Sequence, residues 1–436
     1  MRRRIFLKSI ASAVALTSVA AQKAPKPIPF NRDLFSILLG PAFDGQAELS
    51  IVHSRSERIR YIICDGEQIL TDASYETITY PGNSFRIDKF LVKNLPIDTP
   101  LTLRVYGDDI QIDERTFSSI SSQRNEYAIG LASCMRAAQH DKSIWASLEQ
   151  QKTDLLLFLG DCVYVDYNLE VPLNPKILWE KFVETRMVLH FYHWKKLVPT
   201  IAIWDDHDFG GDNSNRTFPF VKETQTNFKN FFAQNLSEGS FITPGPGIAC
   251  RFQLGNQLFL MLDGRSFRDA PKSGQLYSMF GKEQEDWIFD SINNFDGLVW
   301  LNNGTQWFNL KGYSESFRKQ HTINFNMFVE KLNQANKNVI FTSGDIHFSE
   351  ICETPKFLKN LSLEITSSCM HSSTFVGLPA MNRSENRRGA TSQINYIVSH
   401  TQQHLEDEIK IDNKCYTRNR RLLFTTQMTY NLNKKR

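Results

Sequence analysis

The sequence has no uninterrupted apolar run of the roughly 20 residues that a membrane-spanning helix requires. It also has no internal repeat and no low-complexity tract. Its seven cysteines lack the close pairs typical of structural zinc sites, and their odd number leaves one outside any disulfide scheme. The formal net charge of +3 is too small to attract nucleic acid. These absences point away from zinc-finger and nucleic-acid-binding proteins.

The amino terminus carries an export pattern. Arg3-Arg4-Ile5-Phe6-Leu7-Lys8 is very close to the twin-arginine motif, and an uncharged stretch with small residues at its end follows over residues 9–21. We therefore predict a signal peptide over residues 1–21, export by the twin-arginine (Tat) machinery, and a periplasmic or secreted location. The alternative is an uncleaved amphipathic leader. Loss of the four leader cations lowers the net charge from +3 to about −1.

Residues 30–120 show the alternation of apolar and polar residues that indicates an all-β domain. Turn signals such as Asp65-Gly66 and Pro81-Gly82 separate short segments. We expect strands at residues 47–53, 58–64, 85–92 and 101–106. This spacing is typical of a small immunoglobulin-like sandwich.

Residues 121–400 instead alternate strands with helices, so the fold class is α/β (α+β). Strands are expected at residues 127–132, 155–159, 198–204 and 339–341, and helices at 143–150, 177–188, 284–294 and 325–335. Residues 401–436 are predicted to form a C-terminal extension. Its basic end is either a solvated tail or a weak contact with anionic lipid or polymer.

Acidic and histidine residues recur where three of these strands end. The clusters are Gly160-Asp161 with Tyr164, then Asp205-Asp206-His207-Asp208, and finally Asp345-Ile346-His347. Functional groups of α/β proteins collect at the carboxyl ends of strands. Each cluster alone is also compatible with an ordinary turn or strand end. Together, their hard oxygen ligands and imidazoles predict a site for several metal ions.

Five further residues are candidates for the same site. Cys134 ends another strand and offers a thiolate, while Asp212 and Asn213 follow the second cluster and offer oxygen ligands. Arg136 and Arg265 are candidates for binding phosphate, since a guanidinium group holds phosphate oxygens in a fork. Ordinary turns, packing or surface ion pairs are the alternative roles.

These motifs together resemble the PhoD-like metallophosphatases, also called the alkaline phosphatase D family. The matching pieces occur in family order over roughly residues 30–375: Ser133-Cys134; Gly160-Asp161 with Tyr164 and Asp166; residues 204–210; Leu262-Asp263 with Arg265; residues 280–287; residues 343–350; and residues 364–368. The resemblance implies a calcineurin-like metallophosphoesterase domain with two sheets flanked by helices.

The resemblance also implies the metals. Fe3+ would be held by Cys134, Asp161, Tyr164 and His347, and Ca2+ by Asp161, Asp206 and Asp345. Asp212 or Asn213 would replace an asparagine of the family, and Gly264 stands where the family usually has threonine. His207 would protonate the leaving oxygen or position the phosphoryl group, and Asp161 would bridge the metals.

The implied activity is hydrolysis of a phosphoester by a metal-activated water or hydroxide. The expected protein is an exported monomer acting on phosphodiesters or phosphomonoesters. Two alternatives stay open. One is a phospholipase D-like diesterase acting on lipid or wall-polymer headgroups. The other is an extracytoplasmic binding protein whose metal site has lost catalysis.

Overall fold

The computed structural model describes residues 28–234, 240–270, 276–310 and 315–432. The predicted signal peptide over residues 1–21 and the final basic residues 433–436 lie outside these ranges. No helix within the described ranges has the length and apolar character needed to cross a membrane.

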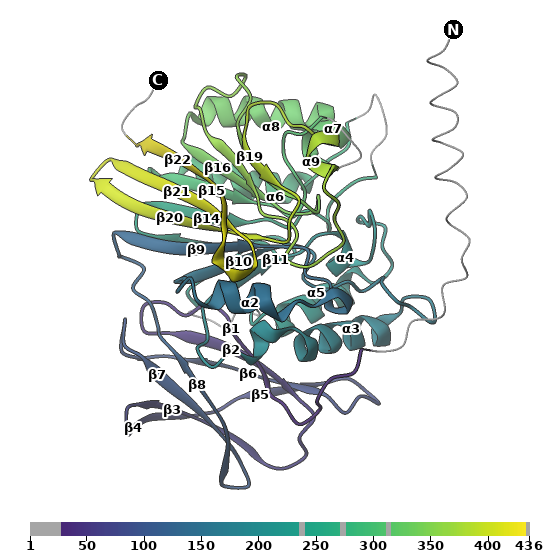
Figure 1. The fold of residues 1–436 in the computed structure, drawn as a ribbon, viewed down its shortest axis with the longest axis vertical. Helices are drawn as coiled ribbons and strands as arrows, with labels where there is room; N and C mark the ends of the chain where they lie inside the picture. Colours follow the sequence, from purple (N-terminus) through teal and green to yellow (C-terminus); the bar gives the residue numbers. More distant parts are fainter. Residues whose placement is uncertain (1–27, 235–239, 271–275, 311–314, 433–436) are drawn as a thin grey trace.

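The amino-terminal domain is a sandwich of two antiparallel four-stranded sheets (Figure 1). The first contains β1 (Ser36–Leu39), β2 (Ala47–His53), β6 (Arg86–Val92) and β5 (Glu76–Thr79), and the second β4 (Gln68–Ala73), β3 (Ile59–Asp65), β7 (Leu101–Gly107) and β8 (Ile110–Phe117). Alternate residues of β7, namely Leu101, Leu103 and Val105, point into the shared core. With the strands lettered in chain order, the sheets read A-B-E-D and C′-C-F-G, which is the strand order of an immunoglobulin-like sandwich.

The second domain contains two larger sheets. The six-stranded sheet is ordered β11 (Thr200–Ile203), β10 (Leu155–Leu159), β9 (Glu126–Ala132), β20 (Tyr396–Leu405), β21 (Glu408–Tyr416) and β22 (Leu422–Asn431). Strands β9, β10 and β11 are parallel, and the other pairs are antiparallel. All five residues of β10 are buried, which explains its uninterrupted apolar sequence.

The eight-stranded sheet is ordered β12 (Thr243–Pro244), β13 (Cys250–Leu254), β14 (Gln257–Met261), β15 (Leu298–Asn302), β16 (Val339–Ser343), β18 (Leu363–Thr366), β17 (Ser349–Glu353) and β19 (Arg387–Thr391). Its two faces pack against different layers. Phe259 and Met261 join the core shared with the six-stranded sheet, whereas Leu258 and Leu260 join a second core under the helices. Strands β14, β15, β16 and β18 are parallel.

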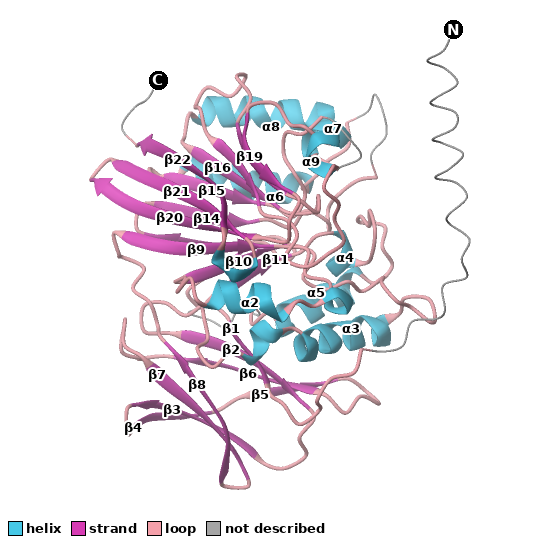
Figure 2. Ribbon diagram, viewed as in Figure 1, coloured by secondary structure: helices cyan, strands magenta, loops and turns pink. Residues whose placement is uncertain are grey.

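Helices cover the outer faces of both sheets (Figure 2). The helices are α2 (Lys142–Glu149), α3 (Pro175–Val188), α4 (Asp206–Phe209), α5 (Val221–Phe231), α6 (Gly281–Asn293), α7 (Phe317–Gln320), α8 (Thr322–Ala335) and α9 (Leu378–Met381), with short 3-10 turns η1 (Ala137–Gln139), η2 (His190–His193) and η3 (Arg418–Arg420). Helix α3 begins where Asn174 accepts a hydrogen bond from the Ile177 amide and Pro175 occupies the first turn. Helices α6 and α8 pack on the eight-stranded sheet. The predicted two-sheet architecture flanked by helices is confirmed.

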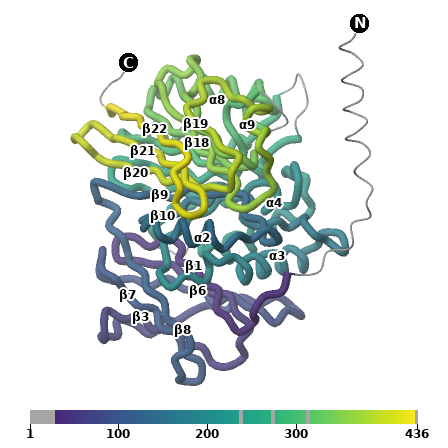
Figure 3. The backbone as a smooth tube through the Cα atoms, in the orientation of Figure 1, coloured from purple at the N-terminus to yellow at the C-terminus, as the bar shows by residue number. Residues whose placement is uncertain are grey.

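The carboxyl-terminal segment requires a correction. The boundary predicted at residue 400 falls inside β20, and residues up to 431 pair as β21 and β22 at the edge of the six-stranded sheet (Figure 3). Alternate residues of β21, such as Ile409, Ile411 and Cys415, are buried, so this part is not a solvated tail. The alternation typical of a strand is present in β21, and the prediction of a basic tail gave its charged residues too much weight.

The two domains share a packed boundary. Arg186 of α3 is completely buried and donates hydrogen bonds to the backbone carbonyls of Ser36, Ser50 and Phe231. Apolar residues of the sandwich, including Leu38 and Val52, belong to the same core as α3 and α5. The sandwich therefore supports the layer beneath the six-stranded sheet.

Candidate metal centre

The predicted site residues lie on loops that leave the carboxyl ends of β9, β10, β11 and β16. The loops from the two sheets touch, because an added Cβ on Gly344 would lie only 2.4 Å from the carbonyl oxygen of Leu159. Likewise, an added Cβ on Gly160 would lie 2.7 Å from the Cβ of Asp205. The strand ends thus converge as predicted, although they belong to two sheets: β9, β10 and β11 to the six-stranded sheet and β16 to the eight-stranded sheet.

Four of these residues adopt a left-handed backbone that is unfavourable for side chains other than glycine. The φ values are 55° for Cys134, 53° for Asp161, 70° for Asp345 and 55° for His347. Such conformations cost of order 1–3 kcal/mol each and concentrate at functional sites.

One group of donor atoms comes from Cys134, Asp161 and His347, whose ligand atoms all lie within 4.8 Å of one another. The Cys134 thiol lies 3.5 Å from Oδ2 of Asp161. The Tyr164 hydroxyl lies 3.3 Å from the same oxygen and 3.4 Å from Nε2 of His347. The structure therefore brings together all four residues that the resemblance assigned to iron.

A second group contains Asp161, Asp206 and His207, again within 4.8 Å of one another. Asp206 begins α4, and its Oδ1 and Oδ2 accept hydrogen bonds from the backbone amides of His207 and Asn213 over 2.9 and 2.8 Å. Asp161 belongs to both groups. Its two carboxylate oxygens can therefore bridge two cations.

The buried carboxylates lack sufficient partners within the protein. Oδ1 of Asp161 and Oδ2 of Asp345 are buried and have no hydrogen-bond partner among the described residues. Burial and the Cys134 thiol raise the pKa of Asp161, and burial and Asp205 raise the pKa of Asp345, both well above the usual range. Burial also raises the pKa of Cys134 to about 12. A cation would supply the missing partner and favour the ionised ligands, so the residues present fit metal binding.

The two histidines differ in their surroundings. Nδ1 of His347 bonds the Ser373 carbonyl over 2.9 Å, which directs Nε2 toward the first group, and burial lowers the pKa of His347 to about 4. Nδ1 of His207 donates to Asp166 over 2.8 Å, and its ring stacks on Tyr164. Burial lowers the pKa of His207, but Asp161, Asp166 and Asp206 outweigh burial and raise it to about 10. His347 is thus suited to binding a metal and His207 to holding a proton.

Asp345, Asp212 and Asn213 occupy less central positions. Asp345 is partly buried beside the site but belongs to neither donor group. The side chains of Asp212 and Asn213 are exposed and bond to each other. Their backbone amides bond Asp166 and Asp206, so these two residues position the site through the main chain and not as the oxygen ligands expected.

The two arginines also have different environments. Arg265 is completely buried, and its guanidinium bonds Asp205, Glu315, Thr305 and the Ser214 carbonyl. All of its nitrogens are engaged in these contacts. Arg265 therefore lacks the free guanidinium group that the predicted contact with phosphate requires. Arg136 is half-buried, and its guanidinium carbon lies 4.7 and 4.1 Å from the ring centres of Tyr164 and Tyr167. Its Nε has no partner among the described residues.

Several supporting residues had no predicted role. Asp166 holds His207, Ser368 contacts the Cys134 thiol over 3.1 Å, and Ser372 contacts the Tyr164 hydroxyl over 2.9 Å. Asp166 and Ser368 lie within the motifs of the resemblance, which is the signal that could have identified them. Glu315 follows no recognisable pattern.

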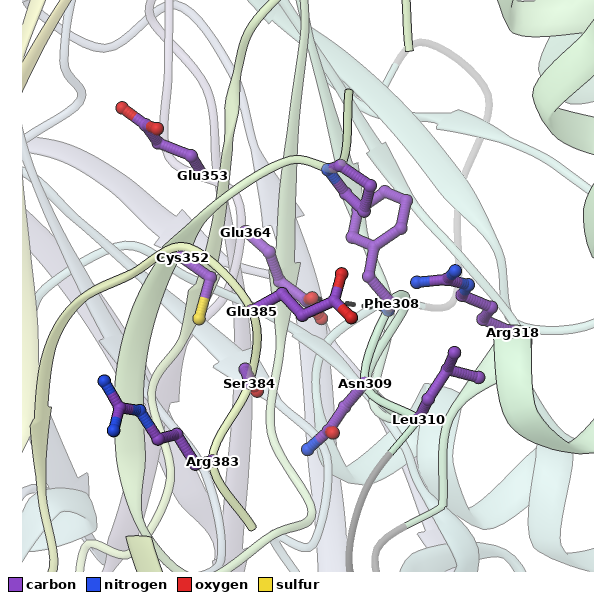
Figure 4. Close-up of a pocket in the computed structure, with 11 residues that line it drawn as sticks. Phe308, Asn309, Leu310, Arg318, Cys352, Glu353, Glu364, Arg383, Ser384 and Glu385 are labelled. Atoms are coloured by element: carbon purple, nitrogen blue, oxygen red, sulfur yellow. Dashed lines mark hydrogen bonds between the residues drawn. The ribbon is translucent and has the colours of Figure 1, made fainter. Parts of the chain in front are cut away.

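A separate small pocket between β17, β18 and residues 308–310 contains no predicted metal ligand (Figure 4). Glu364, which lines it, accepts hydrogen bonds from the backbone amides of Trp307 and Phe308 and from Ser343. Burial raises its pKa to about 7. The matching motif at residues 364–368 therefore includes a residue that supports the loops behind the site.

Comparisons with known proteins identify a family that matches the chain. A family model described as PhoD-like phosphatase matches residues 129–418. A solved structure titled "Structure of PhoD" has a TM-score of 0.70 and 14% identity, and covers 92% of this chain and 94% of that one. The structure of a conserved uncharacterized protein from Streptococcus pneumoniae TIGR4, described as a predicted phosphoesterase, has a TM-score of 0.25 and 10% identity. That match covers 70% of this chain and 99% of the other. A search of curated proteins gave no match.

The matched region contains the eight-stranded sheet, the six-stranded sheet except β22 and the first residues of β9, and all four strand ends that carry the site. A protein of this class is a phosphoric ester hydrolase. More specifically, the chain belongs to the PhoD-like phosphatase family, because the family model covers well over half of its length. The likeness to the solved structure extends the shared fold through the amino-terminal sandwich.

Proposed function

We propose that this protein is an exported, metal-dependent hydrolase of phosphodiesters or phosphomonoesters. The observation that carries the proposal is the position of Asp161, whose carboxylate is shared by two groups of potential metal ligands. Two cations bridged by one carboxylate are a recurring arrangement for phosphoryl transfer. The twin-arginine pattern over residues 3–8 supports the exported location.

We assign Fe3+ to Cys134, Asp161, Tyr164 and His347, and Ca2+ to Asp161, Asp206 and Asp345. Thiolate, phenolate and imidazole suit a transition metal, whereas carboxylate oxygens suit Ca2+. When bound, these cations would supply Lewis acidity and offset the negative charge of the phosphoryl group.

The proton donor in this proposal is His207. Asp166 accepts a hydrogen bond from Nδ1 of His207 over 2.8 Å. Nε2 is then available to transfer a proton to the departing oxygen. The hydrogen bond from Nδ1 to Asp166 favours the protonated ring and therefore raises the pKa of His207, in keeping with this role. Arg136, whose half-buried guanidinium lies over the rings of Tyr164 and Tyr167, is suited to bind a phosphate oxygen at this side of the site.

Replacement of Asp161 by alanine tests the proposal. We expect Asp161→Ala to reduce turnover of aryl phosphate monoesters and diesters to background and to lower the bound metal content, because both groups lose the shared ligand. The matched control is Asp212→Ala, which removes an exposed carboxylate whose side chain does not face the site. Both variants are checked for folding by circular dichroism. An Asp161→Ala protein that retains most of its turnover would contradict the assignment.

A further inference from the structure

Two tyrosine rings hold the side chain of Arg136 beside the metal centre. The guanidinium carbon of Arg136 lies 4.7 Å from the ring centre of Tyr164 and 4.1 Å from that of Tyr167. The Tyr164 hydroxyl in turn lies 3.3 Å from Oδ2 of Asp161, the carboxylate shared by both donor groups. One of the two rings therefore belongs to the metal centre itself. We call Tyr164 and Tyr167 the tyrosine pair.

A single turn of the chain presents both rings to Arg136. The Tyr167 amide donates to the Tyr164 carbonyl over 3.4 Å, so the two residues close a four-residue turn. Inside this turn, the Asp166 side chain accepts a hydrogen bond from Nδ1 of His207 over 2.8 Å. Tyr167 is thus placed by the same turn that supplies a candidate metal ligand and orients the proposed proton donor.

The main chain of Arg136 is fixed as well. Its carbonyl accepts hydrogen bonds from the Gln139 amide and from Nδ1 of His371, each over 3.0 Å. The indole nitrogen of buried Trp145 lies 3.0 Å from Nε2 of His371 and can only donate. Burial lowers the pKa of His371 to about 3, so the neutral ring accepts at Nε2 and carries its proton on Nδ1. The point from which the Arg136 side chain extends is therefore held in place.

The contacts with the tyrosine pair leave the hydrogen-bonding groups of Arg136 unused. A ring face attracts the whole guanidinium charge and takes up no particular N–H group. Among the described residues, Nε of Arg136 has no hydrogen-bond partner and its guanidinium forms no ion pair. By contrast, hydrogen bonds to carboxylates occupy the guanidinium of Arg265. The tyrosine pair fixes an arginine and still leaves its donors for an anion.

We propose that Tyr167 is a positioning residue, whose ring holds the Arg136 guanidinium in the orientation that binds a phosphate oxygen of the substrate. This role rests on the proposed function, in which Arg136 binds phosphate, and deepens it by identifying what prepares that binding. An arginine side chain that is already ordered loses less conformational entropy when it binds an anion. Tyr167 therefore strengthens phosphate binding through Arg136, without contacting the phosphate.

Binding of inorganic phosphate to the full-length, metal-loaded protein, measured by isothermal titration calorimetry, tests this role. We expect Tyr167→Leu to raise Kd for phosphate by about three- to tenfold, because the cation–π contact is lost with the ring. Tyr167→Phe keeps the ring and should raise Kd by less than about twofold. The matched control is Tyr106→Leu, which removes a half-buried tyrosine of the sandwich that bonds Gln111 and should leave Kd unchanged.

A double-mutant cycle separates positioning from simple packing. If Tyr167 acts through Arg136, Tyr167→Leu should change Kd by less than about twofold when Arg136→Leu is already present. A full additional loss in that background would overturn the proposed role, since the ring would then act independently of the arginine. An unchanged Kd in Tyr167→Leu alone, or an equal loss in Tyr167→Phe, would overturn it too.

Turnover distinguishes a failure of this role from a failure of the proposed function. In Tyr167→Leu, KM for an aryl phosphodiester should rise together with Kd for phosphate, while kcat stays within about twofold of wild type. A loss confined to kcat would contradict positioning of a phosphate-binding group. Wild-type protein that neither binds phosphate nor hydrolyses aryl phosphoesters would refute the proposed hydrolase and this role with it. Wild-type binding and turnover that Tyr167→Leu leaves unchanged would refute the role of Tyr167 alone.

Discussion

Arg265 donates a hydrogen bond from Nε to Oδ1 of Asp205 over 2.6 Å, and both side chains are completely buried. Glu315 accepts a second hydrogen bond from the same guanidinium over 2.9 Å. The Arg265 guanidinium also lies 3.8 Å from Oδ2 of Asp206. This buried network links the loops after β11 and β14 directly behind the metal centre. It explains why an arginine near the site need not bind substrate.

Substitution of the two arginines near the site should therefore have different effects, on stability for Arg265 and on KM for Arg136. Arg265→Leu leaves buried carboxylates without a partner and is expected to lower the free energy of unfolding by roughly 3–5 kcal/mol. Arg136→Leu should leave stability nearly unchanged but raise KM for a phosphodiester, since its guanidinium lies over the Tyr164 ring beside the site and forms no ion pair with a described residue. Denaturant unfolding and steady-state kinetics on the same preparations measure both effects. A stable Arg265→Leu protein with only a raised KM would contradict the structural role.

Asp166 should act on turnover through His207. Asp166→Asn keeps the size of the side chain but removes the carboxylate that accepts a hydrogen bond from Nδ1 of His207. We expect kcat to fall by about 10–100-fold with little change in KM, as is common for residues that orient a functional histidine. Asp212→Asn is the control, because only the backbone of Asp212 contacts Asp166. An unchanged kcat in Asp166→Asn would exclude His207 as the proton donor oriented by this contact.

Metal removal should cost both activity and stability. Without cations, the buried carboxylates of Asp161 and Asp345 retain oxygens that have no partner. Chelation is therefore expected to abolish turnover and lower Tm, and restoring the metals should reverse both effects. In the metal-free protein, Asp345→Asn should raise Tm relative to wild type. It removes a carboxyl group whose ionisation burial disfavours, so the metal-free variant should be more stable than metal-free wild type, while the stabilisation by added Ca2+ should be weaker.

Thermal unfolding with and without chelator, for wild type and Asp345→Asn, completes this comparison. Asp212→Asn again serves as the control, since its carboxylate is exposed. Identical melting temperatures before and after complete metal removal, with activity retained, would refute the metal centre.

The sequence predicted the fold well where one signal dominated. The apolar run at 155–159 matches β10 at both ends, and the helix predicted at 177–188 matches the end of α3 at Val188. The proximity of Cys134 and Asp161 followed from the parallel strands β9 and β10, which end at the same edge of the six-stranded sheet. These inferences needed only local periodicity and the rule for parallel strands.

Other features depend on tertiary packing and could not be read from the sequence. Whether Arg265 faces solvent or a buried acid depends on Glu315, which lies 50 residues away. The exposed direction of Asp212 and Asn213 depends on the turn after α4, where only their amides reach the site. By contrast, the alternation in β21 was visible in the sequence, and its charged residues were given too much weight.

The buried Glu364 should give the protein a specific dependence of stability on pH. Its folded pKa is about 7 because of burial, against 4.5 for the free side chain. Between these values the folded protein keeps a proton that the unfolded chain releases, so rising pH favours unfolding. Glu364→Gln cannot ionise. The stability of wild type relative to this variant should therefore fall by roughly 3 kcal/mol between about pH 5 and pH 8.

Denaturant unfolding at both pH values measures the change. Glu385→Gln, at an exposed position of the same pocket (Figure 4), should show no such trend. A constant difference between wild type and Glu364→Gln would show that Glu364 is ionised in the folded protein throughout this range.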